Sequence, residues 1–263
     1  MNIIVCIKQV PDTTEVKIDP KTNRLIREGV PSIMNHDDKT ALEVALQLKE
    51  KNNAKVHVLT MGPPQAEEVL TEALSMGADE ACLLCDKAFA GSDTWATANA
   101  LAAAIKTIEY DILLFGRQAI DGDTAQVGPQ TAENLKLPQI TYAQKIEIGG
   151  NKVKVERELE DGYEIVESNL PCLITVIKEA AIPRYPNLDG IDKAFQKEIK
   201  KITAKDINID EKLIGLLSSP TRVKKVFSPS AKGQGTMLQG SLKDIAKELI
   251  KTLKEKEIIQ KFD

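Results

Sequence analysis

Strand-like and helix-like patterns alternate through the first half of the chain, and this alternation restricts the fold more than any other feature. Short apolar runs predict strands at residues 3–7, 55–60, 80–84 and 111–115. Apolar residues at helical spacing predict helices at about residues 37–51, 65–76, 92–108 and 130–135. A strand–helix–strand order implies parallel strands joined by right-handed crossovers. We therefore predict an open, mainly parallel, twisted α/β sheet with flanking helices.

Beyond this region the pattern changes to antiparallel strands. Residues 146–148 and 152–157 flank Gly149-Gly150-Asn151, and the second arm alternates polar and apolar residues, which predicts a β-hairpin. Two more strands are expected at 163–168 and 172–177. Residues 13–30 are polar and contain Asp19-Pro20, so they are expected to form a hairpin or an excursion from the sheet.

The last part of the chain differs in composition from the rest. Residues 191–263 hold 16 Lys or Arg and 10 Asp or Glu, a net charge of +6, whereas the whole chain has a net charge of −4. A basic tail can bind nucleic acid, but this one has few aromatic residues and no dense basic block. A single helix is expected at about 242–257. We expect an α/β domain at residues 1–190 and a C-terminal arm at 191–263 that packs on another chain, without nucleic acid.

Composition and cysteine usage exclude several classes of protein. Of the 263 residues, 42% are hydrophobic, which is enough for a sizeable core, yet no apolar run approaches the 18 residues of a membrane span. The N-terminus has no basic lead or cleavage site, so a cytoplasmic protein is expected. Cys82 and Cys85 form a C-x-x-C pattern that can mean redox chemistry or zinc, but their strand-like context favours a structural role. The two histidines are far apart, and no metal site is expected.

Residues 116–129 form a turn between a predicted strand and a predicted helix. Ligands bind at the carboxyl ends of strands in open α/β sheets, where helix N-termini attract phosphate. Gly116, Gly122 and Gly128 permit close backbone approach, and Asp123 or Thr124 is expected to cap the helix. An ordinary turn remains an alternative, because the stretch is neither G-x-G-x-x-G nor a P-loop.

The same stretch, Gly-Arg-Gln-Ala-Ile-Asp-Gly-Asp-Thr-Ala-Gln-Val-Gly-Pro, resembles the nucleotide loop of the β subunit of electron-transferring flavoproteins. Residues 5–12, 34–43 and 155–188 resemble the same family in collinear order. The likeness spans about residues 1–190. It implies a Rossmann-like or adenine nucleotide α hydrolase-like fold, and a subunit that works in a heterodimer with a flavin-binding α subunit.

The resemblance also implies which residues form the nucleotide site. Residues bordering the site would be Cys6, Lys8, Asn35, Asp38, Thr60, Met61 and Gly62. Residues holding the phosphates would be Asp121, Gly122, Asp123, Thr124, Gln126, Val127 and Gly128. Asp123 would repel a pyrophosphate, so it more plausibly caps the helix or receives a ribose hydroxyl. Arg117 would donate to the flavin ring, and Leu188 would anchor a partner dehydrogenase.

The nucleotide is FAD in some members of the family and a structural AMP in others. The Gly-Asp-Thr-Ala-Gln-Val-Gly-Pro run resembles the electron-bifurcating branch, which implies FAD here. Such a subunit would accept hydride from NADH and pass electrons towards an acyl-CoA or other flavin dehydrogenase and towards ferredoxin. The alternatives are a non-bifurcating carrier with AMP, a nucleotide-binding regulatory domain, and an adenylate-forming or ATP-hydrolysing enzyme. No catalytic residues are expected in the chain itself, since no Ser-His-Asp order is evident.

Overall fold

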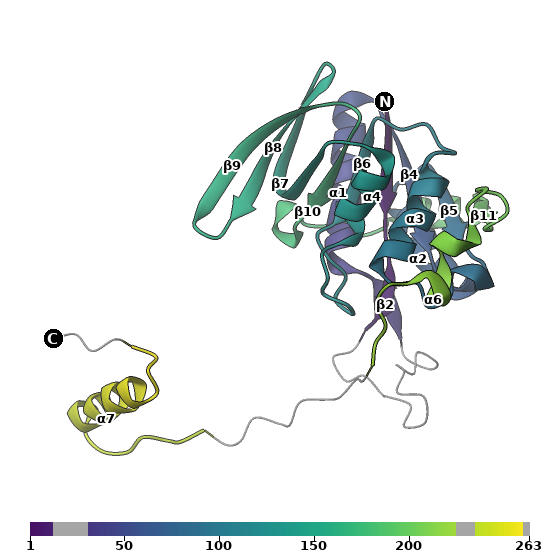
Figure 1. Ribbon diagram of the computed structural model, residues 1–263. Helices are drawn as coiled ribbons and strands as arrows, with labels where there is room; N and C mark the ends of the chain where they lie inside the picture. Colours follow the sequence, from purple (N-terminus) through teal and green to yellow (C-terminus); the bar gives the residue numbers. More distant parts are fainter. Residues whose placement is uncertain (13–30, 225–234, 260–263) are drawn as a thin grey trace. The chain divides into compact units, whose positions relative to one another are not determined.

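The computed structural model describes residues 1–12, 31–224 and 235–259. The chain divides into two compact units, residues 1–225 and 226–263, and each is described by itself. Among the described residues of the first unit, nine strands form a sheet (Figure 1). In spatial order the strands are β11 (Ile199–Ile202), β5 (Glu80–Leu84), β4 (Lys55–Met61), β1 (Asn2–Cys6), β6 (Ile112–Gly116), β10 (Cys172–Val176), β7 (Gln139–Gly149), β8 (Lys152–Leu159) and β9 (Gly162–Asn169).

Parallel pairing runs from β11 to β7, and β7, β8 and β9 continue the sheet as an antiparallel meander. The predicted open, mainly parallel sheet is therefore confirmed. The hairpin between β7 and β8 also lies where the Gly-Gly-Asn turn placed it, and Gly150 there has a φ of +60°. The first arm of this hairpin is longer than predicted, because β7 begins at Gln139 and also pairs with β10.

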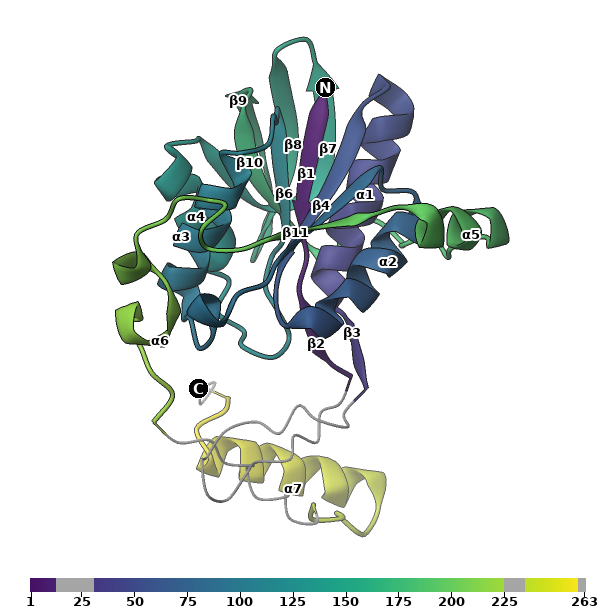
Figure 2. The same cartoon turned by 90° about the vertical axis from the view of Figure 1, so that its right-hand side faces the viewer.

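Helices cover both faces of the parallel part of the sheet (Figure 2). Alternate residues of β1 separate two cores: Ile3 and Val5 join one apolar cluster, and Ile4 and Cys6 join the other. This separation follows from the two-residue period of a strand. The first cluster is covered by α1 (His36–Asn52) and α2 (Glu67–Met76), and the second by α3 (Thr94–Ile105) and α4 (Val127–Leu135).

Local sequence explains where these helices begin and end. Asp93 caps α3 by accepting a hydrogen bond from the Ala96 N–H at 3.1 Å. Gly77 follows α2 with a φ of +126°, a conformation that glycine adopts without strain. None of the helices in the described ranges combines the length and the apolar character needed to cross a bilayer.

A second, two-stranded sheet pairs β2 (Gln9–Pro11) with β3 (Ser32–Met34) in antiparallel register. The predicted excursion at 13–30 joins these two strands but lies outside the described residues. The remaining short elements are the 3₁₀ helices η1 (Pro64–Ala66), η2 (Lys87–Phe89), η3 (Lys178–Ala180) and η4 (Glu211–Leu213), with the helices α5 (Leu188–Gln196) and α6 (Gly215–Ser218).

The first compact unit extends well past the boundary expected at residue 190. β11 pairs with the edge strand β5, and Ile202, Ile207 and Ile214 are buried in the core. Burial of these apolar residues explains why the segment up to residue 225 belongs to the α/β unit. In the second unit, α7 (Leu242–Glu255) confirms the predicted helix, and no residue of α7 is buried within the described part of the chain.

Candidate functional site

The order of the strands reverses between β1 and β6. The chain passes from β1 to β4 and β5 on one side, then returns to β6 on the other side of β1. Cys6 at the end of β1 is in register with Leu59 of β4 and Phe115 of β6, so three carboxyl ends meet at one edge. Open α/β sheets bind ligands at such a position. We call the ends of β1 and β6 and the loops after them the switch point.

A salt bridge joins the two loops of the switch point. Lys8, two residues after β1, donates to both carboxylate oxygens of Asp121 in the loop after β6, at 2.6 and 2.8 Å. The Lys8 side chain is 45% exposed, whereas that of Asp121 is 12% exposed. The ammonium group is therefore accessible to a ligand while it holds the loop.

Asn35 fixes the backbone of the same loop. This buried side chain donates to the Gln118 carbonyl at 2.8 Å and accepts from the Ile120 N–H at 3.1 Å. Both ends of the amide are thus engaged in shaping the loop. Asn35 was expected to border the nucleotide, and the structure shows that its side chain supports the backbone of the loop after β6.

Asp38 joins the ends of the two strands. Its carboxylate accepts from the Lys8 N–H at 2.8 Å and from the Gly116 N–H at 3.1 Å. Burial raises the pKa of Asp38 to about 7, although hydrogen bonds to Asn35, Lys8 and Gly116 favour the charged form. A Cβ atom on Gly116 would overlap this carboxylate, which explains the glycine.

The loop before α4 corrects one prediction. Neither Asp123 nor Thr124 caps the helix, because α4 begins at Val127 with Gln126 at the N-cap and no side-chain cap. Asp123 instead accepts from Gln118 Nε2 at 3.0 Å. Asp123 and Ala125 have φ values of +46° and +53°, so the backbone turns twice through the left-handed region before the helix starts.

The start of α4 offers unpaired N–H groups. Within the described residues, the backbone N–H groups of Val127 and Gly128 have no acceptor, as is usual for a first helical turn. Gly122 and Thr124 are exposed, and a Cβ atom on Gly122 would meet nothing within 4 Å. Gly128 has a packing role, since a Cβ atom there would lie 2.9 Å from Thr175 Cγ2.

Of the remaining residues predicted to border the site, two are buried and two are partly exposed. Thr60 is buried and donates to the Ile7 carbonyl at 2.7 Å, which ties β4 to β1. Cys6 is also buried, and burial raises the pKa of its thiol, which keeps the group protonated. Met61 and Gly62 are partly exposed at the end of β4. Only these last two extend the accessible surface of the switch point towards β4.

Arg117, directly after β6, lies between two residues that the sequence did not single out. Its Nε atom is 3.4 Å from Asp37 Oδ2, and its guanidinium carbon lies 6.0 Å from the centre of the Tyr142 ring. Asp37 was missed because it reads as an ordinary acidic residue in a first helical turn. Tyr142 was missed because its φ of +61° has no signature in the sequence.

Leu188 lies apart from this constellation, at the start of α5, where it is 87% exposed. α5 packs on α2. The chain before it is held by Arg184, which binds the buried Glu43 of α1 through Nε at 2.8 Å and Nη2 at 3.0 Å. Ile182 and Tyr185 are each 92% exposed, so an anchored segment displays apolar side chains to solvent.

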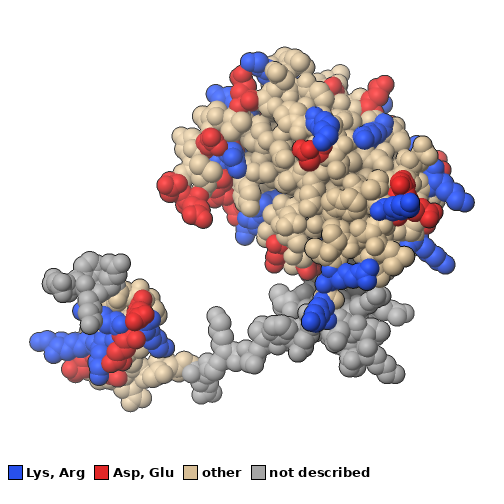
Figure 3. All heavy atoms as spheres, in the orientation of Figure 1, with Lys and Arg blue, Asp and Glu red and all other residues tan. Residues whose placement is uncertain are grey.

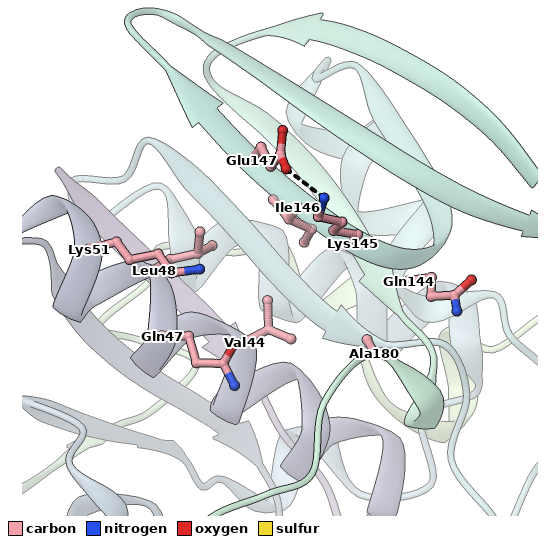
Figure 4. A pocket seen from close by; sticks show the side chains of 9 residues that line it. All are labelled: Val44, Gln47, Leu48, Lys51, Gln144, Lys145, Ile146, Glu147 and Ala180. Atoms are coloured by element: carbon pink, nitrogen blue, oxygen red, sulfur yellow. Dashed lines mark ion pairs between the residues drawn. The ribbon is translucent and has the colours of Figure 1, made fainter.

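Other surface features do not coincide with the switch point. A hollow of about 230 Å³ lies between the C-terminal half of α1 and β7 (Figure 4). Its wall carries a Lys145–Glu147 ion pair at 2.7 Å, so these two charges already have partners. On the face in Figure 3, Lys and Arg are interspersed with Asp and Glu. In the described ranges, no group of three His, Cys, Asp or Glu side chains is arranged to hold a metal.

The residues of the switch point fit an anionic nucleotide. Two cations, Lys8 and Arg117, follow the ends of β1 and β6, and the loop after β6 leads to the unpaired N–H groups of Val127 and Gly128; such groups favour phosphate. The buried atoms Arg117 Nε and Asp37 Oδ2 lack hydrogen-bond partners within the described chain, which leaves donor and acceptor capacity for a ligand. The set contains no nucleophile paired with a base, so it can bind and orient a group but does not suit hydrolysis.

Comparisons with known proteins identify the family of the chain. The electron transfer flavoprotein domain matches residues 22–207. The electron transfer flavoprotein subunit beta of Thermoanaerobacterium thermosaccharolyticum is 56% identical over 260 residues, covering 98% of this chain and 100% of the relative. The caffeyl-CoA reductase-Etf complex subunit CarD of Acetobacterium woodii is 55% identical over 262 residues, with the same coverage.

A third relative is the acryloyl-CoA reductase electron transfer subunit gamma of Anaerotignum propionicum. It is 45% identical over 269 residues, covering 98% of this chain and 100% of the relative. The family domain spans most of the chain, and the relatives match over nearly their full length. The chain therefore belongs to the electron transfer flavoprotein family, among its β subunits.

Proposed function

We propose that this β subunit binds FAD at the switch point and, in a heterodimer with an α subunit, passes electrons from NADH towards a partner dehydrogenase and ferredoxin. The observation that carries the proposal is the combination at one sheet edge of Lys8, Arg117 and the open loop at Gly122, before the unpaired N–H groups of α4. The loop sequence that resembles the bifurcating branch supports FAD over AMP.

The residues of the switch point have separate roles in this proposal. The half-buried Val127 and the buried Gly128 would donate backbone N–H groups to phosphate oxygens, and the exposed Thr124 would offer its hydroxyl from the same loop. Lys8 would share its charge between Asp121 and the ligand. Arg117 would donate to the flavin ring and favour a negatively charged reduced form. The flavin supplies the hydride and single-electron chemistry, and the protein orients and tunes it.

Buried members of the predicted set act through the backbone. Asp38, Asn35 and Thr60 hold the strand ends and the loop in place, so they preorganise the site without touching the ligand. This division explains how one short loop with two strained residues keeps a defined shape. Preorganised binding groups lose less entropy when a ligand arrives.

The partners are proposed from the relatives and from the exposed apolar residues. Two relatives carry the names of caffeyl-CoA and acryloyl-CoA reductase complexes. We propose a flavin dehydrogenase acting on an acyl-CoA as the partner here, docked at Leu188 and the neighbouring apolar side chains. The α7 helix has an apolar side, formed by Ile245, Leu249 and Leu253, that no described residue buries, and we propose that it packs on the α subunit.

The nucleotide released on denaturation of the purified heterodimer tests the proposal. FAD in two equivalents per heterodimer is the expected result, one from each subunit, with flavin absorption bands in the visible spectrum. One equivalent of FAD together with one of AMP would replace the proposal with a non-bifurcating carrier. Electron bifurcation needs a second measurement: NADH oxidation should require the dehydrogenase substrate and oxidised ferredoxin together, and uncoupled oxidation would contradict it.

A further inference from the structure

The Asp37–Arg117 contact differs from an ordinary structural ion pair. Asp37 is 4% exposed, yet its Oδ2 atom and the facing Arg117 Nε atom, 3.4 Å apart, form no hydrogen bond with each other or with another described residue. Guanidinium–carboxylate pairs usually form two parallel bonds at 2.7–2.9 Å. Arg184 and Glu43 in the same molecule show that geometry. The contact at Arg117 is therefore incomplete.

A strained tyrosine closes the other side of Arg117. Tyr142 has a φ of +61°, which is a genuine outlier for a bulky residue. Its N–H donates to the Thr175 hydroxyl at 3.1 Å, and the pairing of β7 with β10 shifts register beside it. Such strain persists only where the surroundings enforce it, and it concentrates at functional sites. Its consequence here is to place the tyrosine ring beside the guanidinium group.

Arg117 itself is held at its backbone but not at its Nη atoms. Its N–H donates to the Val176 carbonyl at 2.8 Å, and no hydrogen bond to Nη1 or Nη2 occurs within the described residues. Burial raises the pKa of Asp37, and Arg117 acts against this shift by favouring the carboxylate. Asp37 thus neutralises part of the Arg117 charge from one side, while the forked Nη donors remain available on the other.

We propose that Asp37 and Tyr142 are positioning residues that hold Arg117 for an oxygen-rich, electron-accepting edge of the bound ligand and set how much positive charge that edge meets. The inference rests on the proposed function, in which the ligand is FAD and the edge is that of the flavin pyrimidine ring. Asp37 acts on the charge of Arg117, and its carboxylate also accepts a hydrogen bond from the backbone of Gln118. Removing the Asp37 charge leaves the guanidinium uncompensated, which stabilises the negatively charged reduced form and raises the flavin potential.

Potential and affinity measurements on the flavin-loaded heterodimer test this arrangement. Asp37→Asn is expected to raise the midpoint potential of the flavin in this subunit, and Arg117→Gln to lower it. Arg117→Gln should also weaken FAD binding about 10–100-fold, which corresponds to the loss of charge-assisted hydrogen bonds. In the double variant the potential should stay close to that of Arg117→Gln, because the charge that Asp37 compensates is then absent. Tyr142→Leu provides a second variant, with weaker FAD binding expected because Arg117 loses its aromatic contact.

Asp79→Asn is the matched control. Asp79 also pairs with a cation, Lys49 at 2.7 Å, but it binds the N–H of Val56 at the opposite edge of the sheet. It should leave the potential unchanged. A normal potential in Asp37→Asn with flavin bound, or a shift that persists in the Arg117→Gln background, would overturn the inference alone. Wild-type protein that binds no flavin in this subunit would overturn the proposed function and the inference together.

Discussion

Replacing Asp38 with asparagine should change how the stability of the first unit depends on pH. The carboxylate accepts two backbone N–H groups, from Lys8 and Gly116, in a buried position. An asparagine side chain has nearly the same shape but only one accepting oxygen. Its amide NH₂ therefore faces one of the two donors, which costs about 1–3 kcal/mol at every pH.

The free energy of unfolding of the wild-type chain also depends on the protonation of Asp38. Burial raises the pKa of Asp38 from 3.8 to about 7, so the native state holds a proton that the unfolded chain has lost between these values. The free energy of unfolding therefore falls as the pH rises through this window. The total loss is about 4 kcal/mol at about 1.4 kcal/mol per pKa unit, and about 2.5 kcal/mol of it falls between pH 5 and pH 8.

Urea unfolding at pH 5 to 8 measures the effect, with the fluorescence of Trp95, the single tryptophan, as the signal. The stability of the wild type relative to Asp38→Asn should fall by about 2.5 kcal/mol between pH 5 and pH 8. Other titrating groups are shared and cancel. Asp79→Asn is the control: the pKa of Asp79 is lowered, so its difference from wild type should stay constant. A constant difference for Asp38→Asn as well would refute the reasoning.

Three further predictions concern packing and assembly. Gly116→Ala should lower stability by about 1–3 kcal/mol because its methyl group overlaps Asp38, whereas Gly122→Ala should change thermal stability by no more than about 0.5 kcal/mol. Arg184→Ala should cost about 2 kcal/mol in urea unfolding, since Glu43 is left buried without its partner. Lys193→Ala, which breaks an exposed pair, should leave the free energy of unfolding within experimental error, and equal costs would contradict the argument. A chain ending at residue 225 should keep the circular dichroism spectrum of the first unit but elute without the α subunit, and its co-elution with the α subunit would argue against the proposed role of the arm. A chain ending at residue 198, which lacks β11, should unfold at a lower temperature.

The alternation of strand-like and helix-like patterns predicted most of the fold, because the spacing of apolar residues follows from which positions are buried. Strands such as β5 and β6 are buried on both faces, so they read as continuous apolar runs. β11 could not be recognised in the same way. Its sequence is Ile-Lys-Lys-Ile, and only the two end positions are shielded from solvent. An edge strand of four residues carries too few apolar positions to show a period.

The hydrogen bonds around the candidate site could not be predicted from the sequence. Asn35, Asp38 and Thr60 lie outside the switch point but bind its backbone, and their partners are 30 to 85 positions away in sequence. No local pattern contains that information. The N-cap of α4 was predicted at the wrong residue for a related reason. Asp123 is a residue type that often caps helices, but its carboxylate accepts a hydrogen bond from Gln118, and the backbone turns again at Ala125 before the helix begins.

The place of β10 in the sheet has a consequence for the order in which the chain can fold during synthesis. β10 lies between β6 and β7, although it is made after β7, β8 and β9. About 55 residues separate the end of β6 from the start of β10, which takes about 3–11 s to translate. During that interval β7, β8 and β9 are made while the edge of β6 has no neighbour, and β10 follows β9 after only two residues. The edge of β6 is therefore exposed for most of this time, whereas the meander receives the strand that joins it to the sheet almost as soon as it is complete.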